Sequence, residues 1–318
     1  MKTTSRKGLT MTRRDFINKT SSVGVVTGVG SRFAISSYSR ADQPQQTALP
    51  RSVSRAPLRI LVIVAHADDM EYNIGGTVAK WVAEGHEVFR AAVTNSARGS
   101  FEAGMTVEKL AKIGIHEAEA AARVLGLKGN FFLGFPDGMT RLADEAVVRE
   151  KLMQLIRRLK ANVVVTWDPW ARLDDHPDHE IASRAAYWAS EFAPFPMFHP
   201  QQFGEKGVES CFVTERYYFA KHPLPSATHV VDVSDHLERK IQALLKYESQ
   251  MRLAYDGYVA YQRTIGVPRE QWSKQVSDDN YRQLMGEAIR REAAEFGKPY
   301  NVRFAEVFRY VRNEPRYP

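Results

Sequence analysis

The stretch from Leu58 to Ala65, apolar at every position except Arg59 and uninterrupted from Ile60 onward, most constrains the fold of this chain. A strand with one solvated face alternates apolar and polar residues, whereas an uninterrupted apolar run is typical of a parallel strand buried on both faces. His86 to Thr94 and Asn162 to Trp167 are also expected to be strands, with amphipathic segments between the expected strands. This alternation predicts an α/β fold with a doubly wound, Rossmann-like, mostly parallel sheet and helices on both faces.

The other expected elements complete this α/β pattern within one domain over residues 58–318. We expect helices over Gly75 to Glu84, Ile115 to Leu125, Ala146 to Leu159, Asp235 to Tyr247 and Asn280 to Phe296. Further strands are expected over Phe131 to Leu133, Tyr217 to Ala220, Val230 to Val233 and Phe304 to Tyr310. The single cysteine, Cys211, allows no internal disulfide and no cysteine cluster for a metal.

The N-terminal residues 1–41 carry the whole charge imbalance of the chain. They hold eight basic residues and one acidic residue, whereas the chain as a whole has a net charge of +7. The body is therefore neutral, which removes the main argument for nucleic-acid binding. TRRDFI at residues 12–17 resembles a twin-arginine signal, and a mildly apolar stretch and small residues before Asp42 follow it.

We therefore expect the twin-arginine machinery to export the protein to the periplasm or beyond the cell, and a disordered basic tail is the alternative. No run of about 18 apolar residues exists, so we expect no permanent membrane span. Residues 42–57 are polar and contain proline, as in a linker.

Two polar motifs follow predicted strands. AHADDME (65–71) directly follows the first strand, and DDHPDH (174–179) lies shortly after the Asn162 to Trp167 strand. Ligands of doubly wound sheets bind at such strand ends. A catalytic zinc needs three protein ligands and an open fourth position, and His66, Asp69 and His179 are the candidates. We expect one Zn²⁺ per chain, with iron or manganese as alternatives because the same ligands suit them.

Amide hydrolysis also needs groups that move protons and stabilise the oxyanion. Asp68 is a carboxylate separate from the ligand Asp69, so it is the candidate general base. His176 is the candidate oxyanion donor, and Asp178 would hold its imidazole oriented and protonated. Either motif alone also suits a structural role, because paired aspartates often cap helices and a lone histidine beside a strand is often structural.

At these residues the chain resembles the LmbE-like, or PIG-L, family of zinc-dependent N-deacetylases, which is marked by AHPDDE and HPDH motifs. The form HADD-x-E followed by Gly75-Gly76-Thr77 looks most like the branch that deacetylates N-acetylglucosaminyl malate in bacillithiol synthesis. LGFPDG (133–138), YESQ (247–250) and AEVF (305–308) extend the resemblance over about residues 58–310.

The resemblance implies the same roles for the motif residues: zinc ligands His66, Asp69 and His179, general base Asp68, and oxyanion stabiliser His176 supported by Asp178. The acid at Glu71 comes one residue later than in AHPDDE. Its expected role is that of a first-turn helix acid favoured by the helix dipole.

Together these features predict zinc-dependent hydrolysis of an N-acyl amide, expected to be N-acetyl, on an amino sugar or glycoside, with release of acetate and a free amine. An amidase for a larger thiol-sugar conjugate and a catalytically inactive zinc- or carbohydrate-binding protein remain as alternatives. Arg98, after the second strand, is a candidate substrate ligand or a solvated loop arginine. The aromatic segment from Trp188 to Gly207 is either a cleft wall or a packed loop, and Trp167 and Trp170 either line the cleft or pack.

Overall fold

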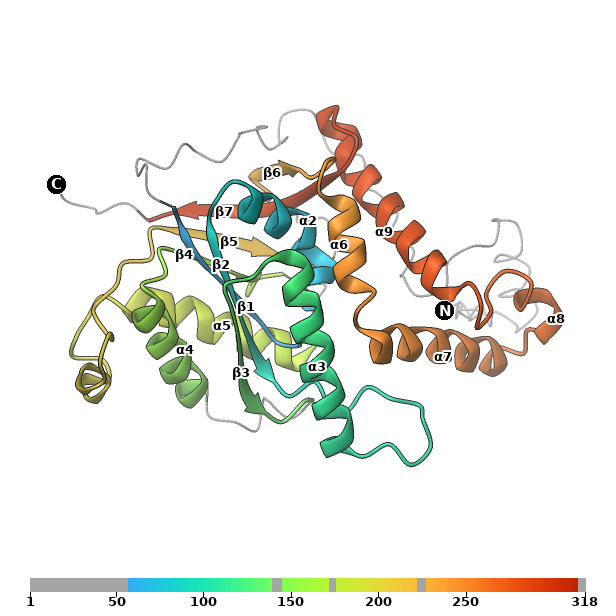
Figure 1. Cartoon of the computed structure of the whole chain (residues 1–318), viewed down its shortest axis with the longest axis horizontal. Helices are drawn as coiled ribbons and strands as arrows, with labels where there is room; N and C mark the ends of the chain where they lie inside the picture. The colour runs from blue at the N-terminus through green and yellow to red at the C-terminus, as the bar shows by residue number, and fades with distance from the viewer. Residues whose placement is uncertain (1–56, 139–144, 172–175, 222–226, 314–318) are drawn as a thin grey trace, which may run out of the picture. The chain divides into compact units, whose positions relative to one another are not determined.

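Seven strands form one sheet in the order β3-β2-β1-β4-β5-β7-β6 in this computed structural model, which describes residues 57–138, 145–171, 176–221 and 227–313 (Figure 1). The strands are β1 Arg59–Val64, β2 Glu87–Thr94, β3 Gly129–Phe135, β4 Val163–Trp167, β5 Glu215–Phe219, β6 His229–Asp232 and β7 Ala305–Arg312. Strands β1 to β5 are parallel, and β7 runs antiparallel to both β5 and β6. The expected export signal and nearly all of the expected linker lie outside the described residues.

Helices cover both faces of the sheet (Figure 1). One face packs against α2 Asp69–Ala83, α3 Val107–Leu125, α6 Leu237–Leu244 and α9 Tyr281–Gly297, and the other against α4 Glu145–Leu159 and α5 Pro177–Phe192. Alternate residues of β1 enter the two cores, Val62 on one side and Ile63 on the other, and both are fully buried. Burial on both faces explains the uninterrupted apolar run and confirms the predicted fold class.

The largest differences from the predicted elements concern helices. Helix α3 begins at Val107, well before the expected Ile115, because Thr106 caps it by accepting the Lys109 N–H at 3.2 Å. Helix α5 begins within the second polar motif and was not expected there. The helices α7 Glu248–Thr264 and α8 Arg269–Trp272 and the 3₁₀ turns η3 Pro200–Gly204 and η4 Lys298–Tyr300 were not expected either.

Helix α2 starts at Asp69, six residues earlier than expected, and is kinked at Ile74. Beyond the kink, the backbone N–H groups of Gly76 and Thr77 donate to the Glu306 carboxylate on β7 at 3.1 and 2.7 Å. A Cβ at Gly76 would lie 2.8 Å from the Val233 Cβ, so this close approach requires glycine. The kink lets one helix both begin at the first motif and pack against β7.

The order of the strands brings the two polar motifs together. β1 and β4 are neighbours, while β2 and β3 lie to one side of them and β5 to the other, so the direction of winding reverses between β1 and β4. The first motif follows β1 and the second lies shortly after β4, at the switch point where such sheets bind ligands. Among the residues that the structure describes, no helix combines the length and apolarity needed to cross a bilayer.

Candidate active site

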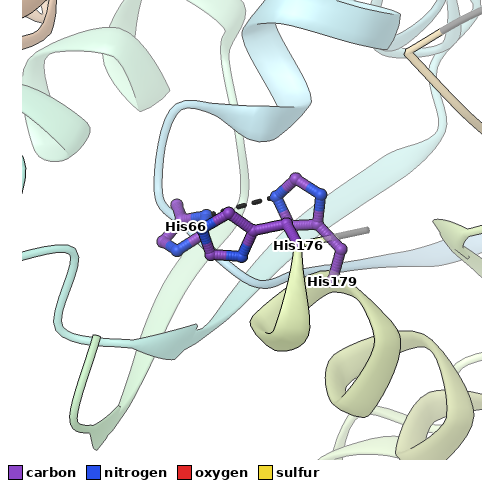
Figure 2. Close-up of side chains that lie close together, drawn as sticks. All are labelled: His66, His176 and His179. Atoms are coloured by element: carbon purple, nitrogen blue, oxygen red, sulfur yellow. Dashed lines mark hydrogen bonds between the residues drawn. The ribbon is translucent and has the colours of Figure 1, made fainter. Parts of the chain in front are cut away.

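Three histidines converge at this switch point (Figure 2). His66 lies in the loop between β1 and α2, whereas His176 caps the N-terminus of α5 and His179 lies in its first turn. Pro177 at the start of α5 favours this helix start because its fixed φ is already helical. The backbone thus presents both histidines of the second motif towards the end of β1.

Three of the expected ligand atoms are close enough to share one ion. His66 Nδ1 lies 3.3 Å from His179 Nε2 and 3.6 Å from Asp69 Oδ1, and His179 Nε2 lies 3.4 Å from Asp69 Oδ1. Ligand atoms bound tetrahedrally to one zinc at about 2.0–2.2 Å are about 3.4 Å apart. His176 adds a third imidazole, with a ring nitrogen within 4.8 Å of those of His66 and His179. The spacing therefore fits a single cation held by two imidazoles and one carboxylate.

The surroundings of His66 direct its Nδ1 lone pair to that point. Its Nε2 lies 3.2 Å from Asp178 Oδ2 and 3.3 Å from Asp137 Oδ1, so the proton belongs on Nε2. A carboxylate on the far nitrogen is the usual way to fix the tautomer of a metal-binding histidine. Asp178 is completely buried and also accepts the Gly138 N–H at 2.7 Å.

The charges of the cluster favour a cation. Burial acts to lower the pKa of His66, but the carboxylates of Asp69, Asp137 and Asp178 outweigh it and raise that pKa well above its usual range. Burial acts to raise the pKa of Asp69, yet the imidazoles of His179 and His66 hold that pKa well below the usual range. Positive charge is therefore stabilised where the ligand atoms meet, which is the electrostatic condition for a metal site.

Asp68 is available for chemistry. Asp68 occupies the N-cap position of α2, but its side chain makes no capping hydrogen bond. The alternative that paired aspartates here only cap a helix therefore does not apply to Asp68. Burial, and next the neighbouring Asp69 carboxylate, raise the pKa of Asp68 to about 6. A carboxylate with a raised pKa is suited to accept and return a proton near neutrality.

His176 is oriented by the backbone of its own helix. Its Nδ1 accepts the Asp178 N–H at 3.2 Å, which places the proton of the neutral imidazole on Nε2. Burial, and next the imidazoles of His66 and His179, lower the pKa of His176. A neutral ring with a fixed Nε2–H can donate a hydrogen bond to a developing oxyanion.

The carboxylate of Asp178 has a different partner from the expected one. We predicted that it would orient His176 and keep it protonated, whereas its side chain contacts His66 and its backbone N–H donates to His176. Since the first turn of α5 directs this side chain toward the loop after β1, the sequence spacing alone could not show which histidine it would reach.

Arg98 is exposed at the rim of the cluster. Its backbone N–H donates to Asp137 Oδ2 at 2.8 Å, and its Cδ approaches Gly138. Asp137 in turn contacts His66, so the loop after β2 is tied to a candidate metal ligand. This position is compatible with the expected contact to substrate.

A comparison with protein families finds one similarity, which includes the site. The family model described as PIG-L: GlcNAc-PI de-N-acetylase matches residues 61–190, a stretch that contains both polar motifs. Over this stretch the chain is similar to the PIG-L/LmbE-like deacetylase family.

Relatives of this family cover most of the chain. A diacetylchitobiose deacetylase from Thermococcus kodakarensis is 26% identical over 253 residues, which are 80% of this chain and 83% of the relative. A 1D-myo-inositol 2-acetamido-2-deoxy-alpha-D-glucopyranoside deacetylase from Actinosynnema mirum is 28% identical in an alignment 240 residues long, which covers 64% of this chain and 84% of the relative. These relatives do not support the expected placement in the bacillithiol branch.

A solved structure supports the fold. The N,N'-diacetylchitobiose deacetylase from Pyrococcus horikoshii, complexed with its inhibitor, superposes with a TM-score of 0.65 at 24% sequence identity. The match covers 80% of this chain and 84% of that chain. At this identity the likeness concerns the fold, which agrees with the predicted doubly wound sheet.

The structure explains why the three further family-like segments accompany the PIG-L motifs. Asp137 of LGFPDG contacts His66, and Glu306 of AEVF holds the kink of α2. The Tyr247 hydroxyl of YESQ donates to the Ala67 carbonyl at 2.7 Å, between the two ends of the first motif. All three segments support the loop that carries His66 and Asp68.

A buried ion pair beneath this PIG-L site was not predicted. Glu71 is fully buried and accepts from Arg90 at 2.8 Å, so it is more than the first-turn acid that we expected. Arg90 also donates to the Ala67 carbonyl at 2.8 Å and to the Tyr247 hydroxyl at 2.6 Å. An arginine within an otherwise apolar predicted strand was the available signal, because a buried charge requires a partner.

The aromatic segment from Trp188 to Gly207 is packed in part. Phe192 and Phe198 stack with ring centroids 4.3 Å apart. The fully buried Arg157 of α4 donates to the carbonyls of Ala193, Phe195 and Phe198. The side chains of Trp188, Phe195 and Phe198 nevertheless stay 38%, 53% and 39% exposed, so packing describes the backbone of this segment better than its aromatic rings.

Proposed function

We propose that this protein is a metal-dependent hydrolase of linear amides that removes an acetyl group from the nitrogen of an acetamido sugar or glycoside. Similarity to the PIG-L/LmbE-like family and to the two deacetylases described above supports the reaction. The observation that carries the proposal is the convergence of His66 Nδ1, His179 Nε2 and Asp69 Oδ1 within 3.6 Å of one another.

His66, Asp69 and His179 would hold the cation, which we propose to be Zn²⁺. A divalent metal there would supply Lewis acidity and lower the pKa of a bound water toward about 7. The set of two nitrogen ligands and one oxygen ligand is typical of catalytic zinc sites that keep a position open for water or substrate. The raised His66 pKa means that metal and protons compete for this cluster.

The remaining groups of the site divide the proton transfers and the charge stabilisation. Asp68 would take a proton from the attacking water and return it to the leaving amine nitrogen. His176 would donate from Nε2 to the oxyanion that develops on the acetyl carbonyl. Asp178 would support the site by holding Nε2 of His66, and Arg98 would bind the sugar at the rim.

Product analysis tests this function. Purified protein loaded with zinc would be incubated with N-acetylglucosamine, diacetylchitobiose and an N-acetylglucosaminyl inositol, and free amine and acetate would be measured. We expect both products in equal amounts, formed at least about 100-fold more slowly by an Asp68→Asn control. Release of a larger acid would favour the amidase alternative, and failure of metal-loaded protein to hydrolyse any acyl amide would favour the inactive binding protein.

We also propose that residues 1–41 direct export through the twin-arginine machinery. The paired Arg13 and Arg14, the mildly apolar stretch and the small residues before Asp42 support this in sequence. Replacing both arginines by lysine keeps the charge and should retain the protein in the cytoplasm. Equal amounts of the variant and the wild-type protein in the exported fraction would contradict the proposal.

A further inference from the structure

Trp167, at the end of β4, contacts two of the three candidate metal ligands. Its indole N–H donates to Asp69 Oδ2 at 3.0 Å. Its ring stacks on the His179 imidazole, with centroids 4.0 Å apart and planes inclined by 13°. The side chain is 2% exposed, so both contacts lie in the protein interior. One rigid group therefore controls a ligand from each of the two motifs.

The two oxygens of Asp69 have different roles because of these contacts. Oδ2 accepts the Trp167 indole N–H and, at 2.8 Å, the backbone N–H of His66. Oδ1 faces His66 Nδ1 and His179 Nε2 instead. An oxygen that already accepts two hydrogen bonds is a poorer metal ligand than one without them, so the carboxylate is prepared to bind through Oδ1 alone.

We propose that Trp167 is a positioning residue that keeps Asp69 monodentate on the metal and fixes the plane of His179, and so preserves an open position for the substrate. The inference rests on the metal site proposed above. Without the indole donor, Oδ2 keeps only the backbone N–H of His66 and can turn more readily toward the cation to occupy that position. Contacts of this kind, one step removed from the metal, typically change affinity or activity by about 10- to 100-fold when they are lost.

Trp167→Phe is the test variant because it retains an aromatic ring at this position and removes the indole donor, although the side chain is smaller. Trp170→Phe is the matched control, since Trp170 lies three residues later, is 56% exposed and packs over Arg309. Zinc affinity would be measured by competition with a chelator, and the d–d absorption of the cobalt(II)-loaded protein would report the coordination number. That absorption weakens as the coordination number rises.

For Trp167→Phe we expect a change of about 10- to 100-fold in the zinc dissociation constant and weaker cobalt absorption, with no change in either for Trp170→Phe. Equal dissociation constants and spectra for the wild-type protein and both variants would overturn the role of Trp167 while leaving the metal site intact. If the wild-type protein itself bound neither zinc nor cobalt, the proposed metal site would fail together with this inference.

A measurement on the wild-type protein tests the inference even if the Trp167→Phe variant does not fold. Nuclear magnetic resonance resolves the indole N–H groups of the five tryptophans. Adding zinc should shift the Trp167 indole signal, because its acceptor Asp69 becomes a metal ligand, and should leave that of Trp170 in place. A Trp167 signal that stays unchanged while zinc binds would overturn the inference.

Discussion

Removing the charge of Arg90 should destabilise the protein strongly, because its partner Glu71 would be left buried and unpaired. Both side chains are 0% exposed, and the guanidinium donates to both oxygens of that carboxylate. Breaking a buried pair from one side typically costs about 3–5 kcal/mol. Stabilities of whole domains are about 5–15 kcal/mol, so Arg90→Met should remove a large part of the total.

The site should respond as well. Arg90 and Tyr247 both donate to the Ala67 carbonyl, between the ligand His66 and the base Asp68. Tyr247 keeps its own hydrogen bond in Arg90→Met, so the loop is loosened but retains one of its two donors. We therefore expect weaker zinc binding together with the loss of stability.

Urea unfolding of the metal-free protein, followed by far-ultraviolet circular dichroism, measures the effect. Arg252→Met is the control, because Arg252 is 50% exposed and its pairs with Asp278 at 2.6 Å and Asp256 at 3.0 Å lie near the surface. Such a pair contributes less than about 1 kcal/mol. The double variant Arg90→Met with Glu71→Leu should recover much of the loss, since no buried charge remains. A loss in Arg90→Met no larger than in Arg252→Met would refute the reasoning.

Three further predictions concern the site and the response to acid. Asp68→Asn should lower kcat by about 100- to 10,000-fold while zinc stays bound, as measured by turnover and metal content, and near-normal turnover would exclude Asp68 as the base. His66→Ala should lose the metal, since it removes one of three ligands, and a full zinc complement by atomic absorption would contradict this. Burial, and next the charge of Lys80, lower the pKa of His229 to about 4, whereas an unfolded histidine titrates near about 6.5. Between these two pKa values the unfolded state binds more protons than the folded state. The protein therefore loses stability as the pH is lowered, by about 2 kcal/mol from pH 7 to pH 5 for this group. His229→Phe should lose correspondingly less stability in urea unfolding at the two pH values, and equal losses in variant and wild type would rule out this cause.

The predicted fold was accessible from sequence because burial on both faces leaves a local signature. The apolar runs at β1, β2 and β4 need no knowledge of their neighbours to be recognised. Helix α5 was missed because its first turn consists of the polar motif itself, and helix α7 because only Met251 and Tyr258 of its residues are buried. A helix with so few buried residues has a weak amphipathic pattern.

The candidate ligands were also accessible, because each motif places several metal-binding side chains within a few residues after a strand. The side chains that contact these ligands could not be predicted from the sequence. Asp137 reaches His66 across the sheet edge from β3, and Trp167 reaches Asp69 from β4. Contacts between segments so far apart in the chain depend on the order of the strands, which the local pattern does not contain.

The sequence by itself determined the parallel sheet, the two motifs and the residue types that suit a divalent metal, since these follow from burial and from side-chain chemistry along short stretches. Only the tertiary structure decided that Asp178 supports His66, that Glu71 pairs with Arg90 and that Trp167 holds Asp69. The physical reason is that hydrogen bonds and ion pairs act over about 3 Å, and the adjacency of β1 and β4 sets which side chains come that close.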